Sequence, residues 1–221
     1  MTKKGKAAQG KKQDTSENEA KKLVKKVSKM PCAITKFNCA PDTYTTNDGR
    51  PLKLEFKWGT HLTGEETGWV VNLFERNMRE MYNMSKDGYD PVQKSQELLA
   101  TTSRYIIVLD PAGGANGEGE KIAYCHYRIV IDYGIPVVYC YELQLEPEYQ
   151  KQGVGTIILG ILEKLSSRAG LTKVMATVFA FNGNSLSFFH KNGYTDDATS
   201  PTVEDDMDYL ILSKVTPPEE S

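Results

Sequence analysis

The sequence lacks the patterns that build metal centres, disulfide frameworks or membrane spans. Its four cysteines form no Cys-x-x-Cys pair and its three histidines are scattered, so we expect no metal site and reduced thiols inside the cell. No apolar run approaches the roughly 20 residues of a membrane helix, and the polar N-terminus argues against a signal peptide. What remains is a chain of 221 residues, 39% of them hydrophobic, which favours one domain with an added tail.

The net charge of −2 hides an uneven distribution along the chain. Residues 1–30 contain ten lysines and three acids, a charge of +7, whereas the remainder has 17 basic and 26 acidic residues, a charge of −9. An acidic body attracts basic partners, although most of its acids are expected to be solvated surface. The lysine run fits either a nucleic-acid or nuclear-import patch or a solvated tail, and nothing else in the sequence supports nucleic-acid binding.

The pattern of apolar residues divides the chain into four parts. We predict a disordered, lysine-rich tail over 1–19, a helix and connector over 20–42, a main domain over 43–216 and a C-terminal tail over 217–221. Predicted strands occupy 51–58, 103–110, 121–132, 136–146, 173–180 and 206–215. Predicted helices occupy 64–84, 92–100, 156–169 and 184–192. This order predicts an α/β (α+β) fold, with a mixed, mostly antiparallel central sheet flanked by helices and an N-terminal helical extension.

A glycine-containing loop between a strand and a helix is the clearest candidate binding site. The stretch EYQKQGVGTIILGILEKL changes from a polar run to an amphipathic helix at Gly153 and Gly155. Glycines let the backbone turn tightly, and a helix N-terminus presents N–H groups and a positive dipole end to an anion. A pyrophosphate fits such a site, and Gln150, Lys151 and Gln152 add side-chain donors. The alternative is that the glycines only cap the helix.

The block from Tyr139 to Tyr194 resembles the acetyl-CoA-binding core of the GNAT superfamily of N-acetyltransferases. Gln150, Gly153 and Gly155 match its pyrophosphate loop, and a second family motif is matched by Asn182, Ser185, Phe188, Phe189, Gly193 and Tyr194. The resemblance implies a GNAT fold with acetyl-CoA as co-substrate. It also implies a set of cofactor-binding residues, namely Leu143, Gln144, Leu145, Gln150, Lys151, Gln152, Gly153, Val154, Gly155, Thr156 and Asn182.

Within the superfamily, residues 53–213 are similar to the NatD branch through YCYELQLE, TVF, SFFHK and NMREMY. That branch acetylates the α-amino group of histone four and histone two-A, whose chains begin Ser-Gly-Arg-Gly. The resemblance therefore implies an N-terminal acetyltransferase of nucleus and cytoplasm, with these histone tails as partners and no auxiliary subunit. The chain departs from the branch where Lys86-Asp87-Gly88-Tyr89 replaces a Trp-Gly-Trp stretch.

The resemblance implies that Glu142 is the general base. An α-amino group with a pKa near ~7.7–8.0 asks only for a modest base. If the strand alternates strictly, the side chains of Glu142 and Tyr141 lie on opposite faces of the sheet. A β-bulge, which is common in the family, would interrupt this alternation. Phe189 replaces the tyrosine that many members use to protonate the leaving thiolate, so Tyr141 is the candidate for this step. Without the resemblance, Glu142 is better interpreted as a paired strand acid.

The resemblance also implies a peptide groove, lined by Tyr82, Asp132, Tyr141, Thr177, Thr199 and Tyr209. Asp132 would pair with the arginine at the third position of the tail, because arginine favours bidentate carboxylate partners. Simpler roles stay open, since Tyr82 and Tyr209 could be packing residues and Asp132 could cap a turn. Two other functions also stay open: acetylation of lysine side chains or a small amine, and a non-catalytic module that binds acetyl-CoA or the peptide.

Overall fold

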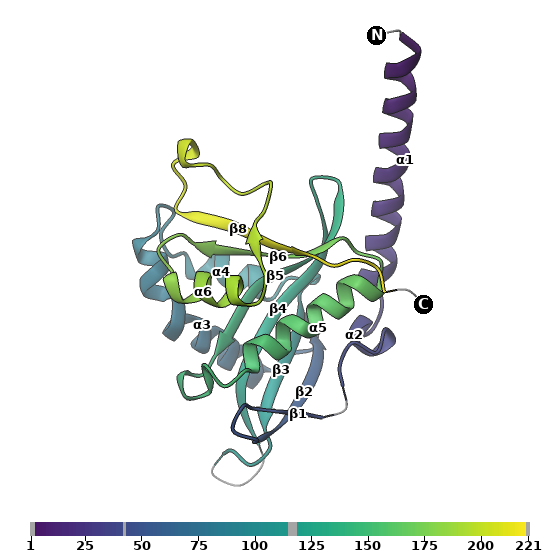
Figure 1. Cartoon of the computed structure of the whole chain (residues 1–221). Coiled ribbons are helices and arrows are strands. Elements are labelled where there is room, and N and C mark those ends of the chain that lie inside the picture. The colour runs from purple at the N-terminus through teal and green to yellow at the C-terminus, as the bar shows by residue number, and fades with distance from the viewer. Residues whose placement is uncertain (1–2, 42, 115–118, 220–221) are drawn as a thin grey trace.

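The computed structural model describes residues 3–41, 43–114 and 119–219, which fold around one eight-stranded sheet (Figure 1). The strand order is β1-β2-β3-β4-β5-β6-β8-β7, and only β5 and β6 are parallel neighbours. The strands are β1 (Tyr44–Thr45), β2 (Pro51–Trp58), β3 (Arg104–Asp110), β4 (Glu120–Asp132), β5 (Ile135–Leu145), β6 (Lys173–Phe179), β7 (Thr195–Asp196) and β8 (Tyr209–Val215). The prediction of a mixed, mostly antiparallel sheet is confirmed.

Helices cover both faces of the sheet (Figure 1). They are α1 (Lys3–Ser28), α2 (Ala33–Lys36), α3 (Gly64–Met84), α4 (Pro91–Leu98), α5 (Val154–Arg168) and α6 (Gly183–Lys191). Apolar residues of α1, α2, α5 and α6 form the larger core cluster on one face, and α3 and α4 form a second cluster on the other. Each face is therefore sealed by its own set of helices, and the sheet separates the two cores.

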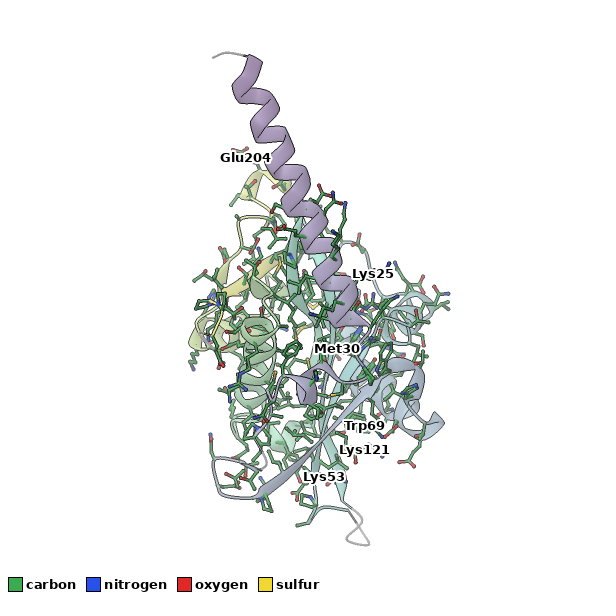
Figure 2. The ribbon with its side chains drawn as sticks, turned by 90° about the vertical axis from the view of Figure 1, so that its right-hand side faces the viewer. Lys25, Met30, Lys53, Trp69, Lys121 and Glu204 are labelled. Atoms are coloured by element: carbon green, nitrogen blue, oxygen red, sulfur yellow. The ribbon has the colours of Figure 1, made fainter. Side chains whose placement is uncertain are left out.

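The N-terminal helix is longer than the sequence predicts. Disorder was expected over 1–19, but α1 begins at Lys3, and Met1 and Thr2 lie outside the described residues. Lysine, alanine and glutamine favour helix, so the helical segment that packs through Val27 continues towards the N-terminus. Figure 1 shows this first part projecting from the body, and Figure 2 shows Lys25 and Met30 nearer the packed end.

The residues at both ends of α4 fix its position in the fold. Asp90 caps its N-terminus by accepting hydrogen bonds from the backbone N–H groups of Val92 (2.8 Å) and Gln93 (3.0 Å). Pro91 occupies the first helical position, where its missing N–H costs no hydrogen bond. At the other end, Leu98 is fully buried in the second core cluster. The helix is therefore fixed at both ends, which matters for the site below.

The described residues contain neither a membrane-spanning helix nor a group of metal ligands. None of the helices there combines the length and the apolar character that crossing a lipid bilayer requires. Nor do His, Cys, Asp or Glu side chains gather there in groups of three or more that could hold a metal ion.

Candidate active site

A cleft of about 1260 Å³ opens where β5 and β6 diverge. Their parallel pairing runs from Val137 opposite Lys173 to Cys140 opposite Ala176. Beyond Cys140, no described strand pairs with the β6 side of β5. Side chains from α3, α4, α6, β8 and the N-terminus of α5 line the resulting space. The cleft thus lies at the single parallel junction of the sheet.

A β-bulge in β5 gathers polar side chains at this cleft. His126 of β4 pairs with Glu142 and Tyr127 pairs with Cys140, which leaves Tyr141 as the extra residue. The Tyr141 ring stacks on His126 at 5.2 Å and lies 5.0 Å from the Tyr139 ring, centroid to centroid. Strict alternation is therefore wrong here, and the implied bulge is confirmed. It places Tyr139, Tyr141 and Glu142 on one face.

Glu142 is buried at the cleft, with 6% of its surface exposed. Its Oε1 lies 2.9 Å from the Nζ of Lys94, and its Oε2 accepts a hydrogen bond of 2.8 Å from the Nε2 of Gln144. Burial raises the pKa of Glu142, while Lys94 and Gln144 act in the opposite direction. A carboxylate offers about four lone-pair directions, so these two partners leave room for a further donor. Glu142 is thus a paired acid that also lines the cleft.

Lys94 is a central residue of the site that the sequence analysis missed. It lines the cleft, is 8% exposed, and pairs with Glu97 at 2.8 Å as well as with Glu142. Its Nζ also lies 4.8 Å from the ring centroid of Phe74 and 5.0 Å from that of Tyr82. A lysine in a short polar helix is normally a surface residue, so nothing in the local sequence points to this role.

Aromatic and hydroxyl side chains form the wall beside Glu142. Tyr82, Thr177 and Tyr209, three of the residues predicted for the peptide groove, all line the cleft. Tyr139, which we had not assigned, joins them, and its hydroxyl lies 2.5 Å from the Oγ1 of Thr177. Burial raises the pKa of both Tyr82 and Tyr139 to about 12, so both hydroxyls keep their protons at neutral pH. Tyr82 also touches the Phe179 ring, so it packs and lines the site at once.

Asp132 and Thr199 lie outside the set of residues that lines the cleft. Thr199 donates its hydroxyl to Asp197 at 2.7 Å, and Asp197 pairs in turn with Lys173, which gives Thr199 a structural role. Asp132 ends β4, and its Oδ2 is buried without a hydrogen-bond partner among the described residues. Burial raises the pKa of Asp132. The two predicted groove residues therefore differ in their contacts. A carboxylate oxygen of Asp132 has no hydrogen-bond partner among the described residues, whereas the hydroxyl of Thr199 donates to Asp197.

The glycine loop has the geometry of an anion site. Gly153 precedes α5 with φ of +85°, and a Cβ built on it would lie 2.6 Å from the Oδ1 of Asn47. A Cβ on Gly155 would lie 2.9 Å from Cζ of Phe188. The positive φ of Gly153 therefore favours glycine, a side chain at Gly155 would need Phe188 to shift, and the first N–H groups of α5 have no partner within the helix. Asn47 was not predicted; its N–H donates to the carbonyl of Gln152 at 2.9 Å and so braces the loop.

The other predicted cofactor residues divide into those at the cleft and those behind it. The lining residues are Leu143, Gln144, Leu145, Gln150, Lys151, Gly153, Gly155, Thr156 and Asn182. Val154 is buried in the core instead, and Gln152 contributes its backbone carbonyl, which accepts the hydrogen bond from Asn47. Asn182 also caps α6 by accepting from the N–H of Ser185 at 3.1 Å. The open edge of β5 and the loop form one continuous surface for an elongated, anionic ligand.

Known proteins share this fold. The model of the acetyltransferase (GNAT) family matches residues 70–194, which is more than half of the chain. Among solved structures, NAA60 of Arabidopsis thaliana in complex with a bisubstrate analogue is similar with 13% identity and a TM-score of 0.53, over 74% of this chain and 99% of that one.

Two further solved structures show the same fold. The GNAT domain of S. lividans PAT has 14% identity and a TM-score of 0.55, over 78% of this chain and 95% of that one. The ribosomal-protein-S18-alanine N-acetyltransferase of Escherichia coli has 14% identity and a TM-score of 0.50, over 76% and 97% of the two chains. Together with the family match and the glycine loop, these likenesses lead to one conclusion: the chain belongs to the GNAT family and is an acetyl-CoA-dependent acetyltransferase.

Proposed function

We propose that the enzyme acetylates the free N-terminal amine of tails that begin Ser-Gly-Arg-Gly, those of histone four and histone two-A, by direct transfer in a ternary complex. The observation that carries the proposal is the buried Glu142 carboxylate, which faces the cleft beside Tyr139 and Tyr141. The NatD-like motifs of the sequence support the choice of tail. We extend the proposal to the nucleus and cytoplasm as the sites of action, with no auxiliary subunit.

The residues at the cleft fit acetyl-CoA. Gly153 and Gly155 let the backbone at the N-terminus of α5 pack closely against Asn47 and Phe188, the helix N-terminus there favours a pyrophosphate, and Lys151 adds a positive charge. The open edge from Leu143 to Leu145 offers backbone groups to the pantetheine arm. When bound, acetyl-CoA supplies an activated acetyl thioester, whose carbonyl carbon accepts the amine nitrogen as the carbon–sulfur bond breaks.

Two side chains move protons in this scheme. Glu142 accepts the proton that the amine loses as its nitrogen bonds to the acetyl carbon. Tyr141 donates a proton to the departing thiolate, since Phe189 at the usual position has no hydroxyl. Burial raises the pKa of Tyr141, so its hydroxyl carries a proton at neutral pH. The two protonation changes balance, because one proton leaves the amine and one reaches the thiolate.

The environment of Glu142 favours an α-amine over a lysine side chain. Burial raises the pKa of Glu142, and the contacts with Lys94 and Gln144 limit that rise, so the carboxylate remains a modest base. At pH 7.5 roughly a third of an α-amine is neutral, against about 0.1% of a lysine amine, from pKa values near ~7.7–8.0 and ~10.4. A modest base therefore suffices only for the N-terminal amine.

Acetyl transfer to three peptides tests this acceptor. The first begins Ser-Gly-Arg-Gly with a free amine, the second is the same peptide with a blocked amine, and the third begins with a different pair of residues. We expect acetylation of the first alone, detected as a mass increase at the N-terminal residue. Turnover of the blocked peptide would instead identify a lysine acceptor and overturn the proposal.

Asp132→Asn is expected to lower kcat/KM for the Ser-Gly-Arg-Gly peptide by roughly tenfold or more. Charge-assisted hydrogen bonds contribute about 1.5–3 kcal/mol, and Asp132 has a carboxylate oxygen without a partner among the described residues. The measurement compares this peptide with one that carries glutamine at the third position. An equal loss with both peptides would rule out arginine recognition. Asp196→Asn, at an exposed carboxylate on β7, is the matched control and should change neither value.

A further inference from the structure

A buried ion pair lies at the floor of the cleft, and the proton-transfer scheme above gives no role to its cation. Lys94 and Glu142 are separated by 48 positions in the sequence, yet their charged atoms meet at 2.9 Å with 8% and 6% of the residues exposed. A buried charge is costly unless it is paired, so each group depends on the other. The pair also lines the same cleft as the cofactor loop.

The sheet holds Lys94 in place through the C-terminal end of α4. The hydroxyl of Tyr105 donates to the carbonyl of Leu98 at 2.9 Å. The carbonyl of Glu97 accepts from the Oγ of Ser103 at 3.2 Å and from the guanidinium of Arg128. These contacts come from β3, β4 and the loop before β3, so the position of the ammonium is set by the fold and not by a flexible side chain alone.

The other titratable groups around Glu142 are neutral near pH 7. They come from α3, β3 and β4, and are Tyr82, Tyr105, Tyr124, Cys125 and His126. Burial raises the pKa of the three tyrosines and of the Cys125 thiol, and lowers the pKa of His126 to about 3. The remaining charged neighbour, Glu97, disfavours ionisation of Glu142. Lys94 is therefore the cation in contact with Glu142.

We propose that Lys94 is a positioning residue that keeps Glu142 ionised and correctly oriented for proton transfer. The inference rests on the proposed role of Glu142 as the base. Lys94 donates a hydrogen bond to Oε1 of Glu142, and Gln144 donates one to Oε2. Each carboxylate oxygen therefore keeps one lone-pair direction for a further donor. The substrate amine or a bridging water can then approach the cleft side of the carboxylate.

The same contacts exclude Lys94 as an acetyl acceptor. Burial alone would lower the pKa of Lys94, but the negative charges of Glu142 and Glu97 raise it above its usual value. The side chain therefore stays an ammonium group, which has no lone pair with which to attack a thioester. We expect no acetylated Lys94 by mass spectrometry after incubation with acetyl-CoA.

The activity test compares the pH dependence of kcat/KM for wild type, Lys94→Met and Lys94→Arg. Ionised Glu142 is the active form, so activity is lost as the pH falls through its pKa. Without Lys94 that pKa rises, and the acidic limb should move to higher pH by roughly 1–3 units, which is a loss of roughly tenfold or more on the acidic limb itself that recovers as the pH rises. Lys94→Arg should keep the wild-type limb. The amine of the peptide titrates equally in all variants, so differences between variants report the enzyme.

The inference is overturned by a loss of activity in Lys94→Met that is the same at every pH, or by acetylation of Lys94. Lys53→Met, at an exposed lysine of β2, is the control and should match wild type. A second readout does not depend on activity. Carbon-13 NMR of labelled enzyme measures the pKa of Glu142, and the signal that disappears in Glu142→Gln assigns the resonance. An unchanged pKa in Lys94→Met sinks the role of Lys94, whereas full activity of Glu142→Gln sinks the proposed base.

Discussion

Glu142→Gln is expected to lower kcat for N-terminal acetylation by roughly 10²- to 10⁴-fold, the usual contribution of a general base. Glutamine keeps the size of the side chain and an oxygen that can face Lys94, but it cannot accept a proton at neutral pH. Because the cofactor surface is formed by the loop before α5 and by the backbone of β5, acetyl-CoA binding should stay within a few-fold of wild type. The loss should therefore appear in kcat and not in KM for acetyl-CoA.

Calorimetric titration with acetyl-CoA and a thermal unfolding curve separate this result from a folding defect. The variant leaves the Lys94 ammonium with Glu97 as its remaining carboxylate, so some loss of stability is expected. Glu120→Gln, at an exposed carboxylate on β4, is the matched control and should keep wild-type activity. If Glu142→Gln binds acetyl-CoA normally and also turns over at the wild-type rate, another group removes the proton and the assignment is wrong.

Apolar patterns that repeat over many residues made most of the fold predictable. Alternating apolar residues identified β2, and the helical spacing predicted both ends of α3, whose N-terminus is capped by a capping box of Thr63 and Glu66. The two-residue strands β1 and β7 were missed, because two residues cannot display a period. The start of α1 was also missed, since a lysine-rich composition suits both disorder and helix, and composition alone does not decide between them.

The candidate site was predictable where its residues are neighbours in the chain. Gln150 and Gly153 lie in the loop before α5 and Gly155 lies in its first turn, and their spacing was enough to predict that they lie together, as they do at the cleft. Glu142 lies on the strand that enters this loop, so its position in the cleft followed from the order of elements. Its orientation did not, because the bulge depends on how β4 and β5 align.

Residues that reach the site from distant segments could not be found in this way. Lys94 meets Glu142 across 48 positions, and Asn47 reaches Gly153 from the turn between β1 and β2. Each lies in a polar stretch where its residue type is common, so the local sequence holds no sign of its partner. Thr199 shows the opposite failure, because a groove role was implied for a hydroxyl that binds Asp197 instead. Tertiary contacts, and not residue type, decide that Lys94 and Asn47 reach the site and that Thr199 does not line it.

Gly153→Ala is expected to raise the KM for acetyl-CoA by roughly tenfold or more with a smaller effect on kcat at saturation. Gly153 has φ of +85°, a region that costs an L-residue about 1–2 kcal/mol, and the new Cβ would meet Asn47 Oδ1 at 2.6 Å. Since about 1.4 kcal/mol corresponds to a factor of ten, strain of this size in the loop is enough for the predicted loss. Initial rates at varied acetyl-CoA and fixed peptide give both constants.

Two companion variants separate the causes of that loss. Asn47→Gly together with Gly153→Ala removes the close contact but not the unfavourable φ, so it should recover part of the acetyl-CoA affinity and not all of it. Gly160→Ala is the control: it lies within α5, a Cβ there meets nothing within 4 Å, and alanine favours helix. It should leave KM unchanged and raise stability slightly. A wild-type KM for Gly153→Ala would mean that the loop tolerates a side chain, and the pyrophosphate would then have to bind elsewhere in the cleft.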